Sequence, residues 1–327
     1  MIQPARFLDI ARRRLDLVIE ALTAKAPKKT IYTLSWSANV ECPASDLGKY
    51  LYKIYNSVFD PKRKTRYLFE ALAGRNMRAA LEMFVEIVMS PHFETDKIWA
   101  TRMKEEPDEL PELMLVRILM RRHYQYFQVR QGNFITNLFD VDRSDERMSL
   151  FLLPILLDRL CLDRKKKGEL NIEGYRHVEK LIEEMTNQGF LAEDVLWGLG
   201  YLLERNLIIA DHQRADRLDR DDYVKITASG HYHMVRLLGD WEYINGMCMD
   251  VWLRDRPTAE TLCELGDLRN DNLDVNQGRI RAKVREFSRA INEEARIHAE
   301  QCAIDAANNT LLSYILNKVN RASFRQP

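Results

Sequence analysis

The stretch at residues 193–208, EDVLWGLGYLLERNLI, decides how the second half of this 327-residue chain is interpreted. Val195, Leu199 and Leu202 recur every three to four residues, which is the spacing of one buried face of a helix. The β-branched run at 207–210 follows directly and favours a strand. The stretch therefore predicts a helix over 192–204 that leads straight into a short strand.

The segments on either side extend this pattern. Apolar periodicity predicts two preceding helices, at 148–162 and 172–187. A second short strand is predicted at 223–227, after the charged loop DHQRADRLDRDD. Three helices followed by strand, loop and strand are the order of a winged helix, a variant of the helix-turn-helix.

The first part of the chain is predicted to be helical. Its helices are expected at 4–25, 44–58, 65–73, 77–89, 94–104 and 109–122. Residues 124–139 lack such periodicity and are predicted to be irregular. Four apolar side chains in this irregular segment should be buried at the junction with the winged helix: Phe134, Ile135, Leu138 and Phe139.

The last part of the chain also shows helical patterning. A helix capped by Ser229 is expected to run to about residue 253, and helices follow over 277–324 with a break near Asn308. The predicted fold class is therefore mainly α, in three domains. These are a helical domain at 1–130, a winged-helix domain at 131–255 and a C-terminal helical region at 256–327.

Charge and composition exclude several classes of partner and site. Lys plus Arg equals Asp plus Glu at 49 each, so no global attraction to nucleic acid or to an anionic membrane is expected. The five cysteines show no metal-ligand or disulfide spacing, which favours free thiols in a reducing compartment. The N-terminus is amphipathic rather than a signal peptide, and no run of about 18 apolar residues occurs. We therefore expect a cytoplasmic protein with no membrane partner.

Known catalytic motifs are missing from the sequence. It contains no GxxxxGK[ST], GxGxxG, GxSxG or HExxH. His231 and His233 stand two apart, which on a helix points them away from each other and does not suit a metal site. We therefore predict no catalytic residue, no metal ligand and no cofactor bound by the chain alone.

One segment, LAGRNMRAALEMF at 72–84, does suggest a site. Gly74 ends one helix, Asn76 caps the next and Arg78 lies in its first turn. A guanidinium offers forked donors to phosphate oxygens. The alternative is that Arg78 pairs with Glu82, four residues on.

This turn resembles the sensor-2 element in the lid of AAA+ NTPases, where an arginine reaches the nucleotide γ-phosphate. The order of elements resembles the back half of origin-recognition-like AAA+ and related STAND-type bacterial P-loop NTPases. The stretches 132–160 and 224–238 resemble that family's lid-to-winged-helix junction and its exit from the wing, so that the resemblance covers residues 1 to about 255. It implies that Arg78 and Asn76 belong to a nucleotide site.

The chain also departs from that family. The family's P-loop, Walker B and sensor-1 strands lie upstream of such a segment, and this sequence begins after them. We therefore expect either a fragment of a longer protein or a chain that acts with a separate P-loop NTPase. ATP and Mg²⁺ are expected only in the complete NTPase.

The charges near the predicted winged helix indicate how well it could contact nucleic acid. The third helix is acidic, and the loop at 211–222 has mixed charge, so neither offers a phosphate-binding stripe. Trp197 and Tyr201, four apart, are predicted to face outward as a partner surface. The other candidate partner contacts are basic: Arg205, Arg121, Arg122, Lys165, Lys166 and Lys167.

These observations lead to two functional hypotheses. The first is a non-catalytic regulatory or interaction module that completes or controls the nucleotide-binding unit of an AAA+-type NTPase. The alternative is a DNA-binding accessory protein that acts through the winged helix and the basic clusters. Expected partners are a P-loop NTPase domain or subunit, with nucleic acid and a second copy of the chain as further candidates.

Overall fold

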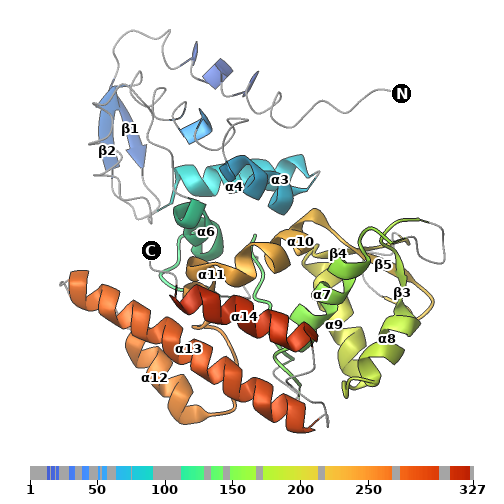
Figure 1. Cartoon of the computed structure of the whole chain (residues 1–327). Coiled ribbons are helices and arrows are strands. Elements are labelled where there is room, and N and C mark those ends of the chain that lie inside the picture. The colour runs from blue at the N-terminus through green and yellow to red at the C-terminus, as the bar shows by residue number, and fades with distance from the viewer. Residues whose placement is uncertain are drawn as a thin grey trace. The chain divides into compact units, whose positions relative to one another are not determined.

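The computed structural model is mainly helical (Figure 1). It describes residues 13–14, 16–18, 20–21, 29–33, 39–43, 51, 54–56, 64–74, 76–90, 112–128, 134–142, 148–166, 172–212, 218–266, 273–301 and 310–324. The chain divides into two compact units. Unit 1 is Met1–Gln125 with Gly132–Ile135, and unit 2 is Tyr126–Gln131 with Thr136–Pro327.

The part of unit 1 that the structure describes contains a hairpin and three helices of ten residues or more. The hairpin pairs β1 (Lys29–Thr33) with β2 (Asn39–Pro43) antiparallel. The helices are α3 (Lys64–Ala73), α4 (Met77–Val88) and α6 (Glu112–Arg121), within three residues of their predicted positions. They bury a core of Leu68, Phe69, Met83, Ile87, Leu115, Ile118 and Leu119.

Other predictions for unit 1 are tested only in part. The described residues within 4–25 and 44–58 are helical, and the helix expected at 94–104 lies outside the described residues. The hairpin β1–β2 was not expected, because its strands lack a clear alternation of apolar and polar residues.

In unit 2, a small sheet is combined with three helices. The order is α7 (Leu152–Asp163), β3 (Arg176–His177), α8 (Val178–Thr186), α9 (Ala192–Glu204), β4 (Ile208–Ala210) and β5 (Tyr223–Ile226). The sheet has the strand order β3–β5–β4 and is antiparallel. The prediction for α9 is confirmed at both ends, and those for β4 and β5 within one residue.

The helix predicted at 172–187 is wrong over its first part. Arg176 and His177 pair with Val224 and Tyr223 of β5, so that this segment becomes strand β3. Periodicity alone does not show this, because the pairing partner lies more than 40 residues further along the chain. The helix predicted at 148–162 likewise begins four residues later, at Leu152.

Two glycines permit close packing around this sheet. A Cβ on Gly198 of α9 would lie 3.1 Å from Leu156 Cδ1, so the glycine lets α9 pack tightly on α7. A Cβ on Gly230 would lie 2.2 Å from the carbonyl oxygen of Leu207, which no side chain can tolerate. Thr227 Oγ1 accepts a hydrogen bond from Gly230 N, which explains the Thr-x-x-Gly turn after β5.

The single helix predicted from Ser229 to residue 253 is wrong. Thr227, not Ser229, caps α10 (Ala228–Val235), which is followed by the 3₁₀ turn η2 (Leu237–Gly239) and α11 (Trp241–Met247). The break occurs because Asp240 accepts hydrogen bonds from the backbone of Glu242 and Tyr243 and so starts a new helix.

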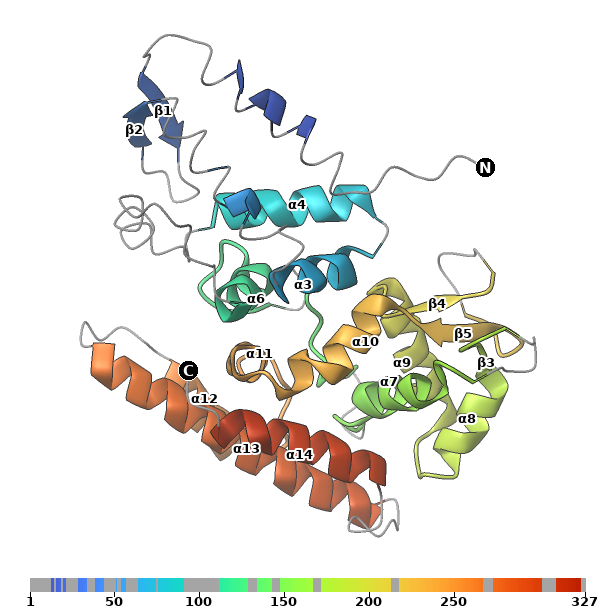
Figure 2. The ribbon, with the colours of Figure 1, turned by 45° about the horizontal axis from the view of Figure 1, so that its top comes forward.

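The C-terminal region contains three described helices, α12 (Arg256–Gly266), α13 (Leu273–Gln301) and α14 (Thr310–Phe324). Helices α13 and α14 lie side by side in both views and run antiparallel (Figures 1 and 2). Asn320 joins them, since Ser288 Oγ and Asn292 Nδ2 both donate to its Oδ1. Helix α12 was not predicted, and the break expected near Asn308 lies outside the described residues. None of the helices described by the structure is long and apolar enough to cross a membrane.

The irregular segment before α7 is buried, as predicted for three of its four apolar side chains. Ile135, Leu138 and Phe139 are fully buried, whereas Phe134 is partly exposed. Side chains of unit 2 supply its hydrogen bonds: Thr136 N donates to His233 Nε2, and Leu138 N donates to the hydroxyl of Tyr243. The Tyr243 hydroxyl donates in turn to the carbonyl of Thr136.

Candidate functional site

The turn before α4 has the local structure that the sequence predicts. Gly74 adopts a left-handed φ of 56°, which a glycine tolerates without strain. Asn76 is the N-cap of α4, and its side chain accepts hydrogen bonds from the backbone of Arg78 and Ala79 at 3.0 and 3.1 Å. The cap directs the first turn of α4 so that Arg78 stands on its surface.

Arg78 itself is highly exposed and paired within its own helix. Its side chain is 88% exposed, and its Nε donates to Glu82 Oε1 at 2.8 Å. This hydrogen bond raises the pKa of Arg78 above its usual value. The pairing with Glu82 is the alternative that helical spacing predicted, and it leaves the other guanidinium N–H groups available to an anion.

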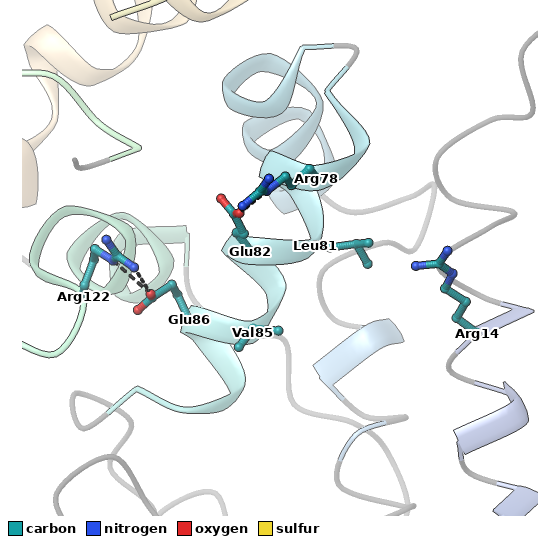
Figure 3. Close-up of a pocket in the computed structure, with 7 residues that line it drawn as sticks. All are labelled: Arg14, Arg78, Leu81, Glu82, Val85, Glu86 and Arg122. Carbon is teal, nitrogen blue, oxygen red and sulfur yellow. Dashed lines mark hydrogen bonds and ion pairs between the residues drawn. The ribbon is translucent and has the colours of Figure 1, made fainter.

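Arg78 lines a pocket of about 490 Å³ in unit 1 (Figure 3). Its guanidinium is joined there by Arg14 from the first helical segment and Arg122 from the end of α6. Leu81 and the Arg14 guanidinium face each other in Figure 3. The full lining is Arg14, Arg78, Leu81, Glu82, Val85, Glu86 and Arg122.

Arg122 is held more firmly than Arg78. Its Nε donates to Glu86 Oε1 at 2.9 Å, and both side chains are mostly buried. Its guanidinium carbon also lies 5.8 Å from the ring centre of Phe134, within range of a cation–π contact. Arg122 is therefore positioned to keep a fixed positive charge at the pocket.

The charges of the lining define what the pocket can bind. Three arginines face two glutamates, a difference of one positive charge, and each glutamate is paired with one arginine. Leu81 and Val85 supply apolar surface, and the Val85 side chain is exposed. The described lining contains no nucleophile–base pair.

Only part of this arrangement follows from the sequence. The predicted residues Arg78 and Arg122 both line the pocket, whereas Asn76 and Arg121 are not among the lining residues. Glu86 was missed, and Arg14 was expected to belong to a solvated basic face of the first helix rather than to this site. The helical spacing of residues 78, 82 and 86 could have indicated Glu86, because residues four apart share one face of a helix. No sequence signal brings Arg14 to this face.

The arginines give the pocket donors for an anionic group. Its arginines could hold a phosphate, but the sequence contains no GxxxxGK[ST] loop whose backbone N–H groups would cradle the rest.

The aromatic pair on α9 forms a second candidate site. Trp197 and Tyr201 stack with ring centres 5.2 Å apart, and the guanidinium carbon of Arg205 lies 5.4 Å from the ring centre of Tyr201. The prediction that both rings face outward is wrong for Tyr201. It is half-buried, and its hydroxyl donates to Asp140 Oδ2 at 2.8 Å. Burial, reinforced by Asp140, raises the pKa of Tyr201 well above its usual range.

The surface of α9 carries acidic rather than basic groups. Glu193 and Glu204 are exposed, and Arg205 at the C-cap is partly buried. The basic cluster after α7 has Lys165 and Lys166 exposed, with Lys166 paired to Asp163 at 3.1 Å. Lys167 lies outside the described residues. Helix α9 therefore lacks the row of cations that a helix in a DNA groove uses.

Comparisons with known proteins identify no relative: neither a family model, nor a curated protein, nor a solved structure matches this chain.

Proposed function

We propose that this chain is a non-catalytic interaction module that completes or controls the nucleotide-binding unit of a P-loop NTPase. The observation that carries the proposal is the exposed Arg78 guanidinium at a pocket that it shares with Arg14 and Arg122. A guanidinium that projects from a first helical turn can reach a phosphate held on another surface. The sequence itself lacks the loop that would hold the rest of the nucleotide.

We also propose that residues 152–226 form a winged helix. The order α7–β3–α8–α9–β4–β5 and the sheet order β3–β5–β4 support this, since a helix-turn-helix followed by a β-hairpin defines that motif. The acidic surface of α9 favours protein contacts over DNA readout. In this proposal the winged helix docks onto a protein partner, and Arg78 of unit 1 contacts the nucleotide.

The test measures ATP hydrolysis by each P-loop NTPase encoded beside this chain, with and without the chain. The chain alone should show no Mg²⁺-dependent turnover. We expect it to change the rate of one NTPase, and Arg78→Ala should abolish that change, because supplied arginines contribute about 10³–10⁵-fold in P-loop NTPases. Arg66→Ala is the matched control, since Arg66 makes the same kind of pair with Glu70 on α3 and does not line the pocket.

Two results would overturn the proposal. One is turnover by the isolated chain that depends on Arg78. The other is an Arg78→Ala variant that changes the rate of the partner NTPase as strongly as the unsubstituted chain.

DNA binding is the second candidate function, and the exposed Lys165 and Lys166 after α7 favour it. Fluorescence anisotropy with duplex DNA separates the two functions. A DNA-binding protein loses affinity steeply between about 50 and 200 mM salt, because phosphate contacts release counterions. We expect no such binding, and a salt-dependent affinity that Lys165→Ala weakens would instead support the accessory function.

A further inference from the structure

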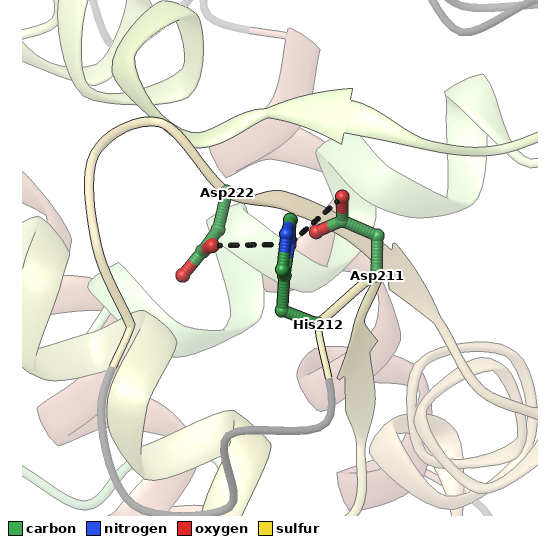
Figure 4. A group of neighbouring side chains, drawn as sticks. All are labelled: Asp211, His212 and Asp222. Atoms are coloured by element: carbon green, nitrogen blue, oxygen red, sulfur yellow. Dashed lines mark ion pairs between the residues drawn. The ribbon is translucent and has the colours of Figure 1, made fainter.

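A compact group of three side chains lies where the hairpin β4–β5 opens into its loop. Asp211 and His212 directly follow β4, and Asp222 directly precedes β5 (Figure 4). His212 Nδ1 is 3.1 Å from Asp211 Oδ2 and 3.5 Å from Asp222 Oδ1. One ligand atom from each residue lies within 4.8 Å of the others, and no other such group occurs among the described residues.

The hairpin holds both carboxylates in place through their second oxygens. Tyr223 N donates to Asp211 Oδ1 at 2.9 Å. In return, Asp211 N donates to the carbonyl of Tyr223, so that two hydrogen bonds join these residues. Asp219 N donates to Asp222 Oδ2 at 2.7 Å. Each carboxylate therefore has one oxygen fixed by the backbone while its other oxygen faces the imidazole.

The His212 imidazole lies between the two carboxylates, with its Nδ1 facing one oxygen of each, and a cation bound there would interact with all three groups. Two negative charges brought this close repel each other unless a positive charge lies between them. An imidazole nitrogen with two carboxylate oxygens is a mixed donor set that suits zinc and similar metals. Calcium and magnesium prefer sites made of oxygen alone.

We propose that Asp211, His212 and Asp222 bind a late first-row divalent cation such as Zn²⁺. The two carboxylates neutralise its charge, and water completes the coordination because all three residues are accessible to solvent. The metal joins the end of β4 to the start of β5 and so closes the base of the loop between them. It ties the two strands together independently of any role of Arg78.

The experiment titrates ZnCl₂ into the metal-free full chain by calorimetry. We expect one Zn²⁺ per chain, and Asp222→Asn and His212→Ala should each weaken the affinity by about 100-fold or more, because even outer-shell changes cost 10–100-fold. Saturating Zn²⁺ should raise the melting temperature of the unsubstituted protein only, since a ligand stabilises the state that binds it. Circular dichroism confirms that the variants fold.

The matched control is His123→Ala, which removes another exposed histidine, in unit 1, and should leave Zn²⁺ binding unchanged. The proposal is overturned if His212→Ala binds Zn²⁺ as tightly as the unsubstituted chain, or if that chain binds less than one equivalent. It is equally overturned if Ca²⁺ or Mg²⁺ binds as tightly as Zn²⁺. If His212→Ala binds Zn²⁺ as tightly as the unsubstituted chain, His212 serves only to pair with the two carboxylates.

Discussion

The turn before α4 and the aromatic pair on α9 were both singled out by short-range spacing, but only the first behaves as that spacing suggests. Arg78 interacts with Glu82, four residues away, and stays on the surface. Tyr201 stacks on Trp197, four residues away, but its hydroxyl is taken up by Asp140, 61 residues earlier. The contacts of a side chain near the start of a surface helix can be predicted from its neighbours in the sequence. Those of a half-buried ring depend on residues far away along the chain.

The largest expected effect is a loss of stability when the buried segment that contains Asp140 is disturbed. Phe139 is fully buried, and its ring meets Phe287 of α13 edge-on at 5.8 Å. We expect Phe139→Ala to lower the free energy of unfolding by about 3–5 kcal/mol. Chemical denaturation measures this, with the exposed Leu162→Ala of α7 as control. An unchanged stability would show that the segment does not organise unit 2.

Acid should weaken the same region. Burial lowers the pKa of His233 to about 4, and burial followed by the charge of Arg254 lowers that of His298 to about 4. Because the unfolded chain then binds more protons than the folded one below pH about 6.5, stability falls as the pH drops through that value. Each histidine should cost about 2 kcal/mol between pH 7 and pH 5.

Asp158 has the opposite effect on how stability changes with pH. Burial raises its pKa to about 6, although Lys318 lowers it in part, so the folded state takes up this proton first. Asp158 therefore stabilises the folded state increasingly as the pH falls below about 6. Asp158→Asn should remove this contribution, so that the free energy of unfolding falls more steeply with acid. Urea unfolding at pH 7 and pH 5 tests both statements. Equal stability of the Asp158→Asn variant at the two pH values would contradict the assignment of the histidines.

A smaller loss of stability is expected when the hydrogen bond between Tyr201 and Asp140 is removed. Tyr201→Phe keeps the stacked ring and removes the hydroxyl that donates to the buried carboxylate. Hydrogen bonds to charged groups contribute about 1.5–3 kcal/mol, so the unfolding free energy should fall by that amount. In the Asp140→Asn background, the further cost of Tyr201→Phe should be smaller, since a neutral acceptor makes a weaker bond. If Tyr201→Phe is neutral, the ring is a free surface after all and the contrast with Arg78 fails.

The smallest effect belongs to Arg78. Its pair with Glu82 is open to solvent, and such pairs contribute little to stability. Arg78→Ala should therefore leave the melting temperature unchanged, while Asn76→Ala should lower it, because the cap is worth about 1 kcal/mol. A marked loss of stability in Arg78→Ala would mean that the arginine is structural, which would remove the basis for its proposed role.

Local chemistry in the sequence determined much of this protein. The cap at Asn76, the left-handed turn at Gly74 and the full extent of α9 all follow from neighbours within four residues, where backbone hydrogen bonds and side-chain spacing act directly. Only the tertiary structure decided that Arg176 and His177 join β5 and that Arg14 reaches the pocket of Arg78. The same holds for Asp211, His212 and Asp222: nine residues lie between the last two in the sequence, and the antiparallel pairing of β4 with β5 brings them together. Contacts of this kind form because separate segments bury surface and pair their backbones jointly, which the spacing of apolar residues along one segment does not report.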